Sequence, residues 1–300
     1  MKNPLYRKRV LSYLSQKMQD DIGDRGDITT DNVVSKKLRA TATIKSKQNG
    51  IIAGIEEITL FYKKYGLKAK CNFKDGDSVK AGDIIFILNG NAQTLLKTER
   101  TGLNFLQMMS GIASNTRRYV DAIKGYYAKV AATRKCWADE YLEKKAVFVG
   151  GALTHRIGLH GAIMIKDNHL KAVELELKGN KNFIQAAIER AYNTQLHCGV
   201  IIEVKNKKEA IFAAEIFRRL KQKKSGMIPT IMLDNMSFTE EKKTVLLIHD
   251  AALIEASGNV DLTNIVNHAK TGVDVISTSR LNRGAGALDL SQKIMIKAGI

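Results

Sequence analysis

The second half of the chain repeats one pattern, in which a short, mainly apolar run ends in charged or hydroxyl residues. Each run is the length of one strand, and the stretches between the runs are typical of helices. Continuous apolar strands that alternate with helices indicate a parallel sheet covered on both faces, as in a (β/α) barrel. The runs are Ala128–Ala132, Ala162–Ile165, Val200–Ile202, Ile231–Leu233, Ala252–Ile254 and Val273–Ile276.

Barrels of this kind build their active site at the C-terminal ends of the strands. The polar residues that we expect there are Arg134, Lys135, His155, Arg156, Lys166, Glu203 and Asp234. Five of them are bases and two are acids. The set predicts a pocket for a highly anionic substrate, with the acids available for a metal or a sugar.

The pattern of apolar and polar residues is different before about residue 105. Residues 1–22 predict a helix, and Gly23–Thr30 a polar loop rich in turn formers. Short alternating segments between Arg39 and Leu96 predict a small α/β domain. A helix from about Ala92 to Asn115 would join that domain to the barrel.

The 300 residues and their 44% apolar content allow two domains with substantial cores. We expect an N-terminal domain over residues 1–110 and a barrel over residues 111–282. The tail from about residue 283 to residue 300 could pack with the first domain.

Several features favour a cytoplasmic protein. No run approaches the roughly 18 to 20 apolar residues that span a bilayer, and Met1–Leu5 lacks the apolar stretch of a signal peptide. Cys71, Cys136 and Cys198 are far apart, without metal-ligand spacing. Free thiols of this kind fit a reducing compartment.

The net charge of +18 comes from 48 Lys and Arg against 30 Asp and Glu. A strong basic excess suits nucleic acid, phosphorylated metabolites or a lysine-rich solvated surface. The solvated surface accounts for much of it, because many lysines form pairs on expected helix surfaces without interleaved aromatic residues. No nucleic-acid motif is visible, so we do not expect nucleic-acid binding as the main role.

Each polar cluster could instead have a purely structural role, as an ion pair or a helix cap. Lys166 and Asp167 could form a local ion pair, and Glu203 could pair with Lys205 or Lys207. Asp234 could cap a helix that starts near Ser237. The arrangement of seven such residues at successive strand ends favours a site over surface decoration.

Six blocks of the chain resemble, in order, the signature blocks of the quinolinate phosphoribosyltransferase family, the decarboxylating nicotinate-nucleotide pyrophosphorylases. Even the early Gly26–Thr30 fits that family. The blocks are Glu99–Gln107, Thr133–Lys135, Gly150–Leu159, Ile165–His169, Met232–Met236 and Glu255–Gly258.

The resemblance implies an N-terminal α/β sandwich domain followed by an open (β/α) barrel of the type II phosphoribosyltransferase kind. It implies transfer of the phosphoribosyl group of 5-phosphoribosyl-1-pyrophosphate to quinolinate, with Mg²⁺ required. Pyrophosphate and CO₂ would be released and nicotinate mononucleotide formed. It also implies a homodimer, or a higher oligomer of dimers, in which Arg100 reaches the neighbouring site.

Quinolinate carries two carboxylates and its co-substrate several phosphate charges. Arginine can bind a carboxylate in two-pronged fashion, whereas lysine acts as a point charge. We therefore expect Arg100, Arg134, His155 and Arg156 at the carboxylates. Lys135, Lys166, Glu203 and Asp234 would be the catalytic residues, the two acids holding Mg²⁺ or the ribose hydroxyls. The candidates for the 5′-phosphate are Ser257, Gly258, Asn259, Ser277, Ser279 and Arg280.

The chain also departs from the family's usual residues. Glycines are common where Asn259 and Ser279 stand, a small residue where Arg280 stands, and an acidic residue where Lys205 stands. The usual Thr-Thr-Pro-Gly is replaced by Cys136–Asp139. Trp137 could stack on a heteroaromatic ring, but we expect it to fill a hydrophobic gap.

These departures leave two other functions open. One is a related phosphoribosyltransferase that acts on another acidic heterocycle, as in the molybdenum-transport-associated pyrophosphorylases. The other is a protein that binds a phosphorylated metabolite or RNA without turnover. Glu203 and Asp234 argue against the second, because a pure anion binder gains nothing from acids in its pocket.

Overall fold

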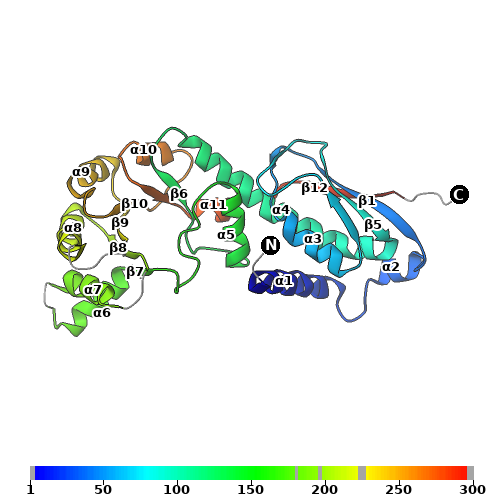
Figure 1. Ribbon diagram of the computed structural model, residues 1–300, viewed down its shortest axis with the longest axis horizontal. Helices are drawn as coiled ribbons and strands as arrows, with labels where there is room; N and C mark the ends of the chain where they lie inside the picture. Colours follow the sequence, from blue (N-terminus) through cyan, green and yellow to red (C-terminus); the bar gives the residue numbers. More distant parts are fainter. Residues whose placement is uncertain (1–3, 180–181, 195–197, 222–227, 296–300) are drawn as a thin grey trace. The chain divides into compact units, whose positions relative to one another are not determined.

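The computed structural model describes residues 4–179, 182–194, 198–221 and 228–295. The chain divides into two compact units, each with its own sheet (Figure 1). The first unit comprises Met1–Arg117, Lys145–Gly151 and Gly284–Ile300, and the second comprises Arg118–Lys144 and Ala152–Arg283. Within the described residues, no helix combines the length and apolarity needed to cross a membrane.

An antiparallel sheet in the order β12-β1-β5-β3 forms the first unit together with helices. The outward-facing Arg39 and the buried Ala40, Ala42 and Ile44 illustrate the alternation that puts one face of β1 in the core. The strands are β1 (Arg39–Ser46), β3 (Lys68–Cys71), β5 (Ile84–Asn91) and β12 (Leu290–Met295), with β2 (Gly50–Ile51) and β4 (Ser78–Val79) pairing separately. The helices are α1 (Pro4–Ile22), α2 (Ile28–Val33) and α3 (Ile55–Lys64).

The start of α2 was expected to be loop. Asp27 accepts a hydrogen bond from the backbone N–H of Thr30 at 2.9 Å and so caps the helix. An N-cap of this kind satisfies one of the free N–H groups of a first turn. The polar turn therefore ends before Ile28, and the prediction of a loop through Thr30 is wrong for the last three residues.

The long helix α4 (Ala92–Ala122) extends beyond the predicted end at Asn115. Ile112 and Tyr119 lie on its apolar face and Ile123 follows directly after its last residue; all three are 4% exposed. This spacing keeps the side chains on one face of a helix and so extends it.

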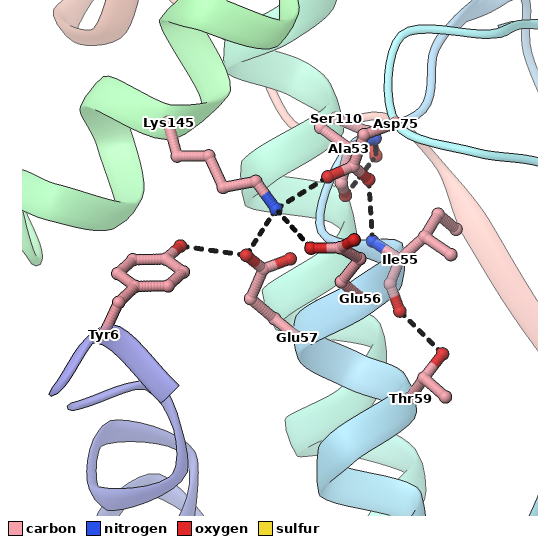
Figure 2. Close-up of polar contacts among 9 residues, drawn as sticks. All are labelled: Tyr6, Ala53, Ile55, Glu56, Glu57, Thr59, Asp75, Ser110 and Lys145. Carbon is pink, nitrogen blue, oxygen red and sulfur yellow. Dashed lines mark hydrogen bonds and ion pairs between the residues drawn. The ribbon is translucent and has the colours of Figure 1, made fainter. Parts of the chain in front are cut away.

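A cluster of charges around Lys145 stabilises the first unit (Figure 2). The Lys145 Nζ contacts a carboxylate oxygen of the fully buried Glu57 and lies 2.7 Å from Asp75 Oδ2. The Tyr6 hydroxyl donates a second hydrogen bond to Glu57 at 2.9 Å. Burial by itself would lower the pKa of Lys145, but Glu57 and Asp75 outweigh it and raise that pKa.

Six parallel strands form the sheet of the second unit, in the order β6-β11-β10-β9-β8-β7. They are β6 (Lys129–Ala131), β7 (Ile163–Ile165), β8 (Val200–Val204), β9 (Pro229–Asp234), β10 (Leu253–Ser257) and β11 (Val275–Ser277). All six overlap predicted runs, and β8, β9, β10 and β11 extend beyond the C-terminal ends of theirs. In the described residues, β6 and β7 do not pair with each other, and Leu153 makes only a single parallel bridge to Ala131. The expected open barrel is confirmed.

Helices of the second unit follow the strands and cover the sheet (Figure 1). The register places Ser257 beside Asp234, and Ser277 beside Ala131. The C-terminal ends of neighbouring strands therefore meet at one edge. The helices are α6 (Asp167–Glu176), α7 (Phe183–Tyr192), α8 (Lys207–Lys221), α9 (Phe238–Ile248), α10 (Ile265–Ala269), α11 (Arg280–Arg283) and the start of α5 (Glu140–Val149), whose residues from Lys145 onward belong to the first unit.

Candidate active site

A pocket of about 820 Å³ lies at the C-terminal ends of the strands of the second unit. Thirteen of the fourteen predicted site residues line it: Arg134, Lys135, His155, Arg156, Lys166, Glu203, Asp234, Ser257, Gly258, Asn259, Ser277, Ser279 and Arg280. Arg100 is the remaining one, and it is exposed on α4 in the first unit. The barrel thus gathers residues that are far apart in the sequence.

Positive charge dominates the pocket wall. Six cationic side chains and three carboxylates line it, with His155 in addition: Arg134, Lys135, Arg156, Lys166, Arg280 and Arg283 against Glu203, Asp234 and Glu255. Among the described residues, Lys135, Arg156 and Arg283 have no carboxylate within ion-pair distance. The pocket therefore has positive charge available for an anionic ligand.

Glu203 pairs inside the pocket rather than with its sequence neighbours. Its Oε2 lies 2.6 Å from the Lys166 Nζ. Lys205 instead lies 3.5 Å from Asp167, at the surface and outside the pocket lining. The local pairing considered from the sequence is therefore wrong for both Glu203 and Lys166.

Arg134 and Arg156 present two guanidinium groups to the same pocket. Burial, and next the charge of Arg134, lower the pKa of Arg156. The only carboxylate in ion-pair contact with Arg134 among the described residues is Glu140, at 3.5 Å. A dianionic ligand between the two guanidinium groups would relieve their repulsion.

His155 adopts the left-handed region, with φ 53°. Its Nε2 lies 3.0 Å from Oε2 of Glu255, a side chain that is 2% exposed. Glu255 follows the apolar start of β10 and lines the pocket. The sequence contained that signal, a charged residue after an apolar run, but Glu255 was not among the predicted site residues.

Two asparagines beside the expected phosphate loop are also left-handed, Asn235 with φ 54° and Asn259 with φ 49°. The Asn259 side-chain amide donates to Asn235 Oδ1 at 3.0 Å, and the Asn235 amide donates to Asp234 Oδ1 at 3.1 Å. Asparagine adopts this conformation more readily than most residues. Asn259 is therefore compatible with the turn at a position where a glycine is usual, and it adds a link between two strand ends.

Ser237, and not Asp234, caps α9. The Ser237 hydroxyl accepts from the backbone N–H of Glu240, so the capping role considered for Asp234 is wrong. Asp234 stays at the end of β9 and lines the pocket.

The end of β11 provides hydroxyl groups and backbone amides. The Ser277 Oγ is buried without a hydrogen-bond partner among the described residues. Thr278 accepts from the backbone N–H of Arg280 at 3.1 Å and donates to Val260 O at 2.7 Å. A buried hydroxyl without a partner is consistent with a polar ligand or water at this position.

Trp137 does not fill a hydrophobic gap. The side chain lines the pocket and is 71% exposed. The Arg283 guanidinium carbon lies 4.7 Å from its ring centroid, within the range of a cation–π contact. Our packing prediction for Trp137 is wrong, and Arg283 was missed although it stands one helical turn after Arg280.

Cys136 is a protonated thiol at neutral pH. Burial, and next the charges of Glu143 and Glu140, raise its pKa to about 11. Nucleophilic attack by cysteine requires the thiolate. Covalent catalysis by Cys136 is therefore disfavoured.

Comparison with known proteins shows similarity over nearly the whole chain. Family models described as the C-terminal and N-terminal domains of quinolinate phosphoribosyl transferase match residues 112–293 and 27–110. A probable nicotinate-nucleotide pyrophosphorylase (carboxylating) of Methanocaldococcus jannaschii is 34% identical, over 95% of this chain and 97% of that protein. A mitochondrial quinolinate phosphoribosyltransferase (decarboxylating) of Nicotiana glauca is 32% identical, over 97% of this chain and 83% of that protein.

Solved structures give the same picture. The nicotinate-nucleotide pyrophosphorylase of Francisella tularensis superposes with a TM-score of 0.84 at 30% identity, covering 98% of both chains. The NadC protein of Streptococcus pyogenes gives 0.83 at 32% identity, again covering 98% of both.

Proposed function

Since the chain belongs to the quinolinate phosphoribosyl transferase family, we propose that it joins quinolinate to 5-phosphoribosyl-1-pyrophosphate. The products are nicotinate mononucleotide, pyrophosphate and CO₂, which places the enzyme in NAD biosynthesis. The observation that carries the proposal is the pocket at the strand ends, in which six cationic side chains and three carboxylates meet. Its charge suits two substrates that are both polyanions.

We assign the carboxylates of quinolinate to the side of the pocket formed by Arg134, His155 and Arg156. Burial, and next the charge of Arg134, lower the pKa of Arg156; a dianion would offset the repulsion between the two guanidinium groups, which supports this assignment. Lys135 adds a fourth positive or hydrogen-bonding group. Planar arginines would also fix the orientation of the pyridine ring.

We assign the phosphoribosyl donor to the part of the pocket that is formed by the acidic side chains and the glycine-containing turn. Ser257, Gly258, Asn259, Ser277, Ser279 and Arg280 would bind the 5′-phosphate through amides, hydroxyls and one guanidinium. Glu203 and Asp234 would hold the ribose hydroxyls and stabilise positive charge that develops at the anomeric carbon. Lys166, 2.6 Å from Glu203, would neutralise phosphate charge and keep Glu203 in place.

The two acids are also suitable for Mg²⁺. In the described residues, no group of three or more His, Cys, Asp or Glu forms a ready metal cluster. Magnesium commonly binds one or two carboxylates and completes its shell with substrate phosphates and water, so Glu203 and Asp234 fit this donor set. When bound there, the ion would neutralise charge on the departing pyrophosphate.

Decarboxylation needs little from the protein beyond orientation. Bond formation between the ring nitrogen and the anomeric carbon expels pyrophosphate and leaves the nitrogen positively charged. That charge stabilises the carbanion left when the C–C bond to the adjacent carboxylate breaks. The carbanion then takes up one proton as CO₂ leaves. The cationic wall would hold and orient the ring.

Arg100 is assigned to the pocket of a neighbouring subunit. It is an exposed cation on α4, outside the pocket lining of its own chain. A homodimer with shared sites would use it as a further carboxylate ligand.

The three free cysteines support a reducing, cytoplasmic location.

The proposal is tested with purified protein, quinolinate, 5-phosphoribosyl-1-pyrophosphate and Mg²⁺. We expect nicotinate mononucleotide and CO₂ to form in equal amounts, measured by chromatography and by release of labelled CO₂. Nicotinate in place of quinolinate serves as the control, since it lacks the second carboxylate. Folded protein that forms neither product would contradict the proposal and favour another acidic heterocycle as substrate.

A further inference from the structure

Two adjacent residues of α5, Glu143 and Lys144, contact the backbone of the pocket loops without lining the pocket themselves. Each is 2% exposed. Buried charged side chains are costly unless their hydrogen-bonding groups are satisfied. What these two side chains bind is therefore informative.

Glu143 joins two segments of the pocket wall. One carboxylate oxygen accepts from the backbone N–H groups of Trp137, at 2.8 Å, and Ala138, at 2.5 Å. The other accepts from the side-chain amide of Asn282 at 2.5 Å. That amide also donates to the carbonyl of Lys135 at 2.8 Å. The loop with Lys135 and Trp137 is thus tied to the short helix with Arg280 and Arg283.

Lys144 holds the third segment. Its Nζ donates to the carbonyls of Thr154 and Arg156, each at 2.6 Å. These carbonyls flank His155, whose left-handed backbone is strained for a residue other than glycine. Lys144 therefore holds both ends of a strained turn that points His155 and Arg156 into the pocket. Burial is the main cause of its lowered pKa.

We propose that Glu143 and Lys144 are positioning residues of this enzyme, which fix the two loops and the short helix that carry Lys135, His155, Arg156 and Arg283 without touching substrate. The inference rests on the proposed function for its kinetic consequences. The alternative is that both residues only stabilise α5. The helix offers a matched control, because the next residue, Lys145, is also a lysine in a buried cluster of polar contacts, but its partners are Glu57 and Asp75 in the first unit (Figure 2).

Lys144→Met and Lys145→Met test Lys144 against this control. We expect both variants to melt at a lower temperature, because each loses buried polar contacts. Only Lys144→Met should lose kcat/KM for quinolinate, by about 10- to 100-fold, as expected when binding groups shift by up to an ångström. The Lys145→Met variant, assayed well below its melting temperature, should stay within about twofold of wild type, since Lys145 shares no partner with the pocket residues: it contacts Glu57 and Asp75, which do not line the pocket.

Lys144→Arg keeps the charge with a planar donor set and covers the case in which Lys144→Met fails to fold. We expect it to recover part of the activity with a higher KM for quinolinate. Equal kcat/KM for wild type and both Lys144 variants would overturn the role of Lys144. So would a parallel loss in Lys144→Met and Lys145→Met.

Glu143→Gln is tested through Trp137, the only tryptophan in the chain. The N–H groups of Trp137 and Ala138 and the Asn282 amide are all donors to Glu143, so a glutamine with one acceptor oxygen would leave at least one of them facing its NH₂ group. We expect time-resolved fluorescence anisotropy to gain a fast component as the Trp137 loop is released. Unchanged anisotropy together with unchanged kinetics would overturn the role of Glu143.

The two readouts separate this inference from the proposed function. If wild-type protein does not turn over quinolinate, the proposed function fails. The anisotropy of Trp137 still tests whether Glu143 holds the loop, because it needs no substrate.

Discussion

The Arg134 side chain makes a weak ion pair within its own chain, as expected for a residue that binds a ligand. In the described part of the chain its one ion pair, with Glu140, spans 3.5 Å between side chains that are 38% and 28% exposed. Partly exposed pairs of this kind stabilise a fold by at most about 1 kcal/mol. The side chain is therefore available for a substrate carboxylate.

We predict that Arg134→Ala lowers kcat/KM for quinolinate by about 100-fold or more, the loss of about 3 kcal/mol that a charged hydrogen-bonding partner contributes. The free energy of unfolding in urea should change by less than about 1 kcal/mol. Glu140→Gln removes the ion pair but keeps Arg134, and it should retain most activity. A fully active Arg134→Ala variant would exclude Arg134 from the carboxylate site.

Cys136 leads to a second prediction at this scale. Because its pKa is raised to about 11, the thiolate fraction is small at neutral pH and grows about tenfold for each pH unit up to that pKa. We expect iodoacetamide labelling of the Cys136 peptide, followed by mass spectrometry, to accelerate in this way from pH 7 to pH 9. A rate that levels off below pH 9 would contradict the raised pKa.

At the scale of elements, the turn after β10 depends on Gly258. Its φ is 100°, and a Cβ at this position would lie 2.3 Å from Asn235 Oδ1. The neighbouring Asn235 and Asn259 are themselves left-handed. The turn therefore combines backbone strain with close contact between two strand ends.

Gly258→Ala should cost more stability than backbone strain alone. Gly125 is the matched control, because its φ is 96° but a Cβ there would meet nothing within 4 Å. We expect Gly125→Ala to lower the free energy of unfolding by about 1–2 kcal/mol. Gly258→Ala should lower it further and raise the KM for 5-phosphoribosyl-1-pyrophosphate. Equal stability of the two variants, with an unchanged KM, would show that the turn adapts to a side chain.

At the scale of the whole molecule, the position of Arg100 raises the question of assembly. Each chain has a pocket in one unit and an unused exposed cation in the other. In a shared site, one chain would supply Arg100 and its partner Arg156. Two inactive chains could then complement each other.

We predict that Arg100→Ala and Arg156→Ala are each nearly inactive and recover activity when mixed. In a random mixture about half of the dimers are hybrids, and each hybrid has one intact site, so activity should approach a quarter of wild type, as symmetry requires. Subunit exchange is verified by native mass spectrometry of one isotope-labelled chain. Exchange without recovery would exclude Arg100 from the partner's site.

The amino-acid sequence by itself determined the strands of the barrel and most of the pocket. Parallel strands that are buried on both faces are continuously apolar, so each strand could be recognised in the sequence as an apolar run. The polar residues that follow each run could then be assigned to the C-terminal end of the barrel. Glu203, Asp234 and Ser277 belong to this class. Local capping was less visible, and the first residues of α2 were therefore predicted to be loop.

Only the tertiary structure decided how the pocket residues are paired and held. Whether Glu203 contacts Lys166 or Lys205, and whether Trp137 is exposed, depends on segments that are distant in sequence and adjacent in space. The same holds for Glu143 and Lys144, which look like an ordinary charged pair on a helix. Glu143 contacts Asn282, and Lys144 contacts the carbonyl of Arg156. Sequence spacing does not predict these contacts, because they depend on how the chain folds back on itself.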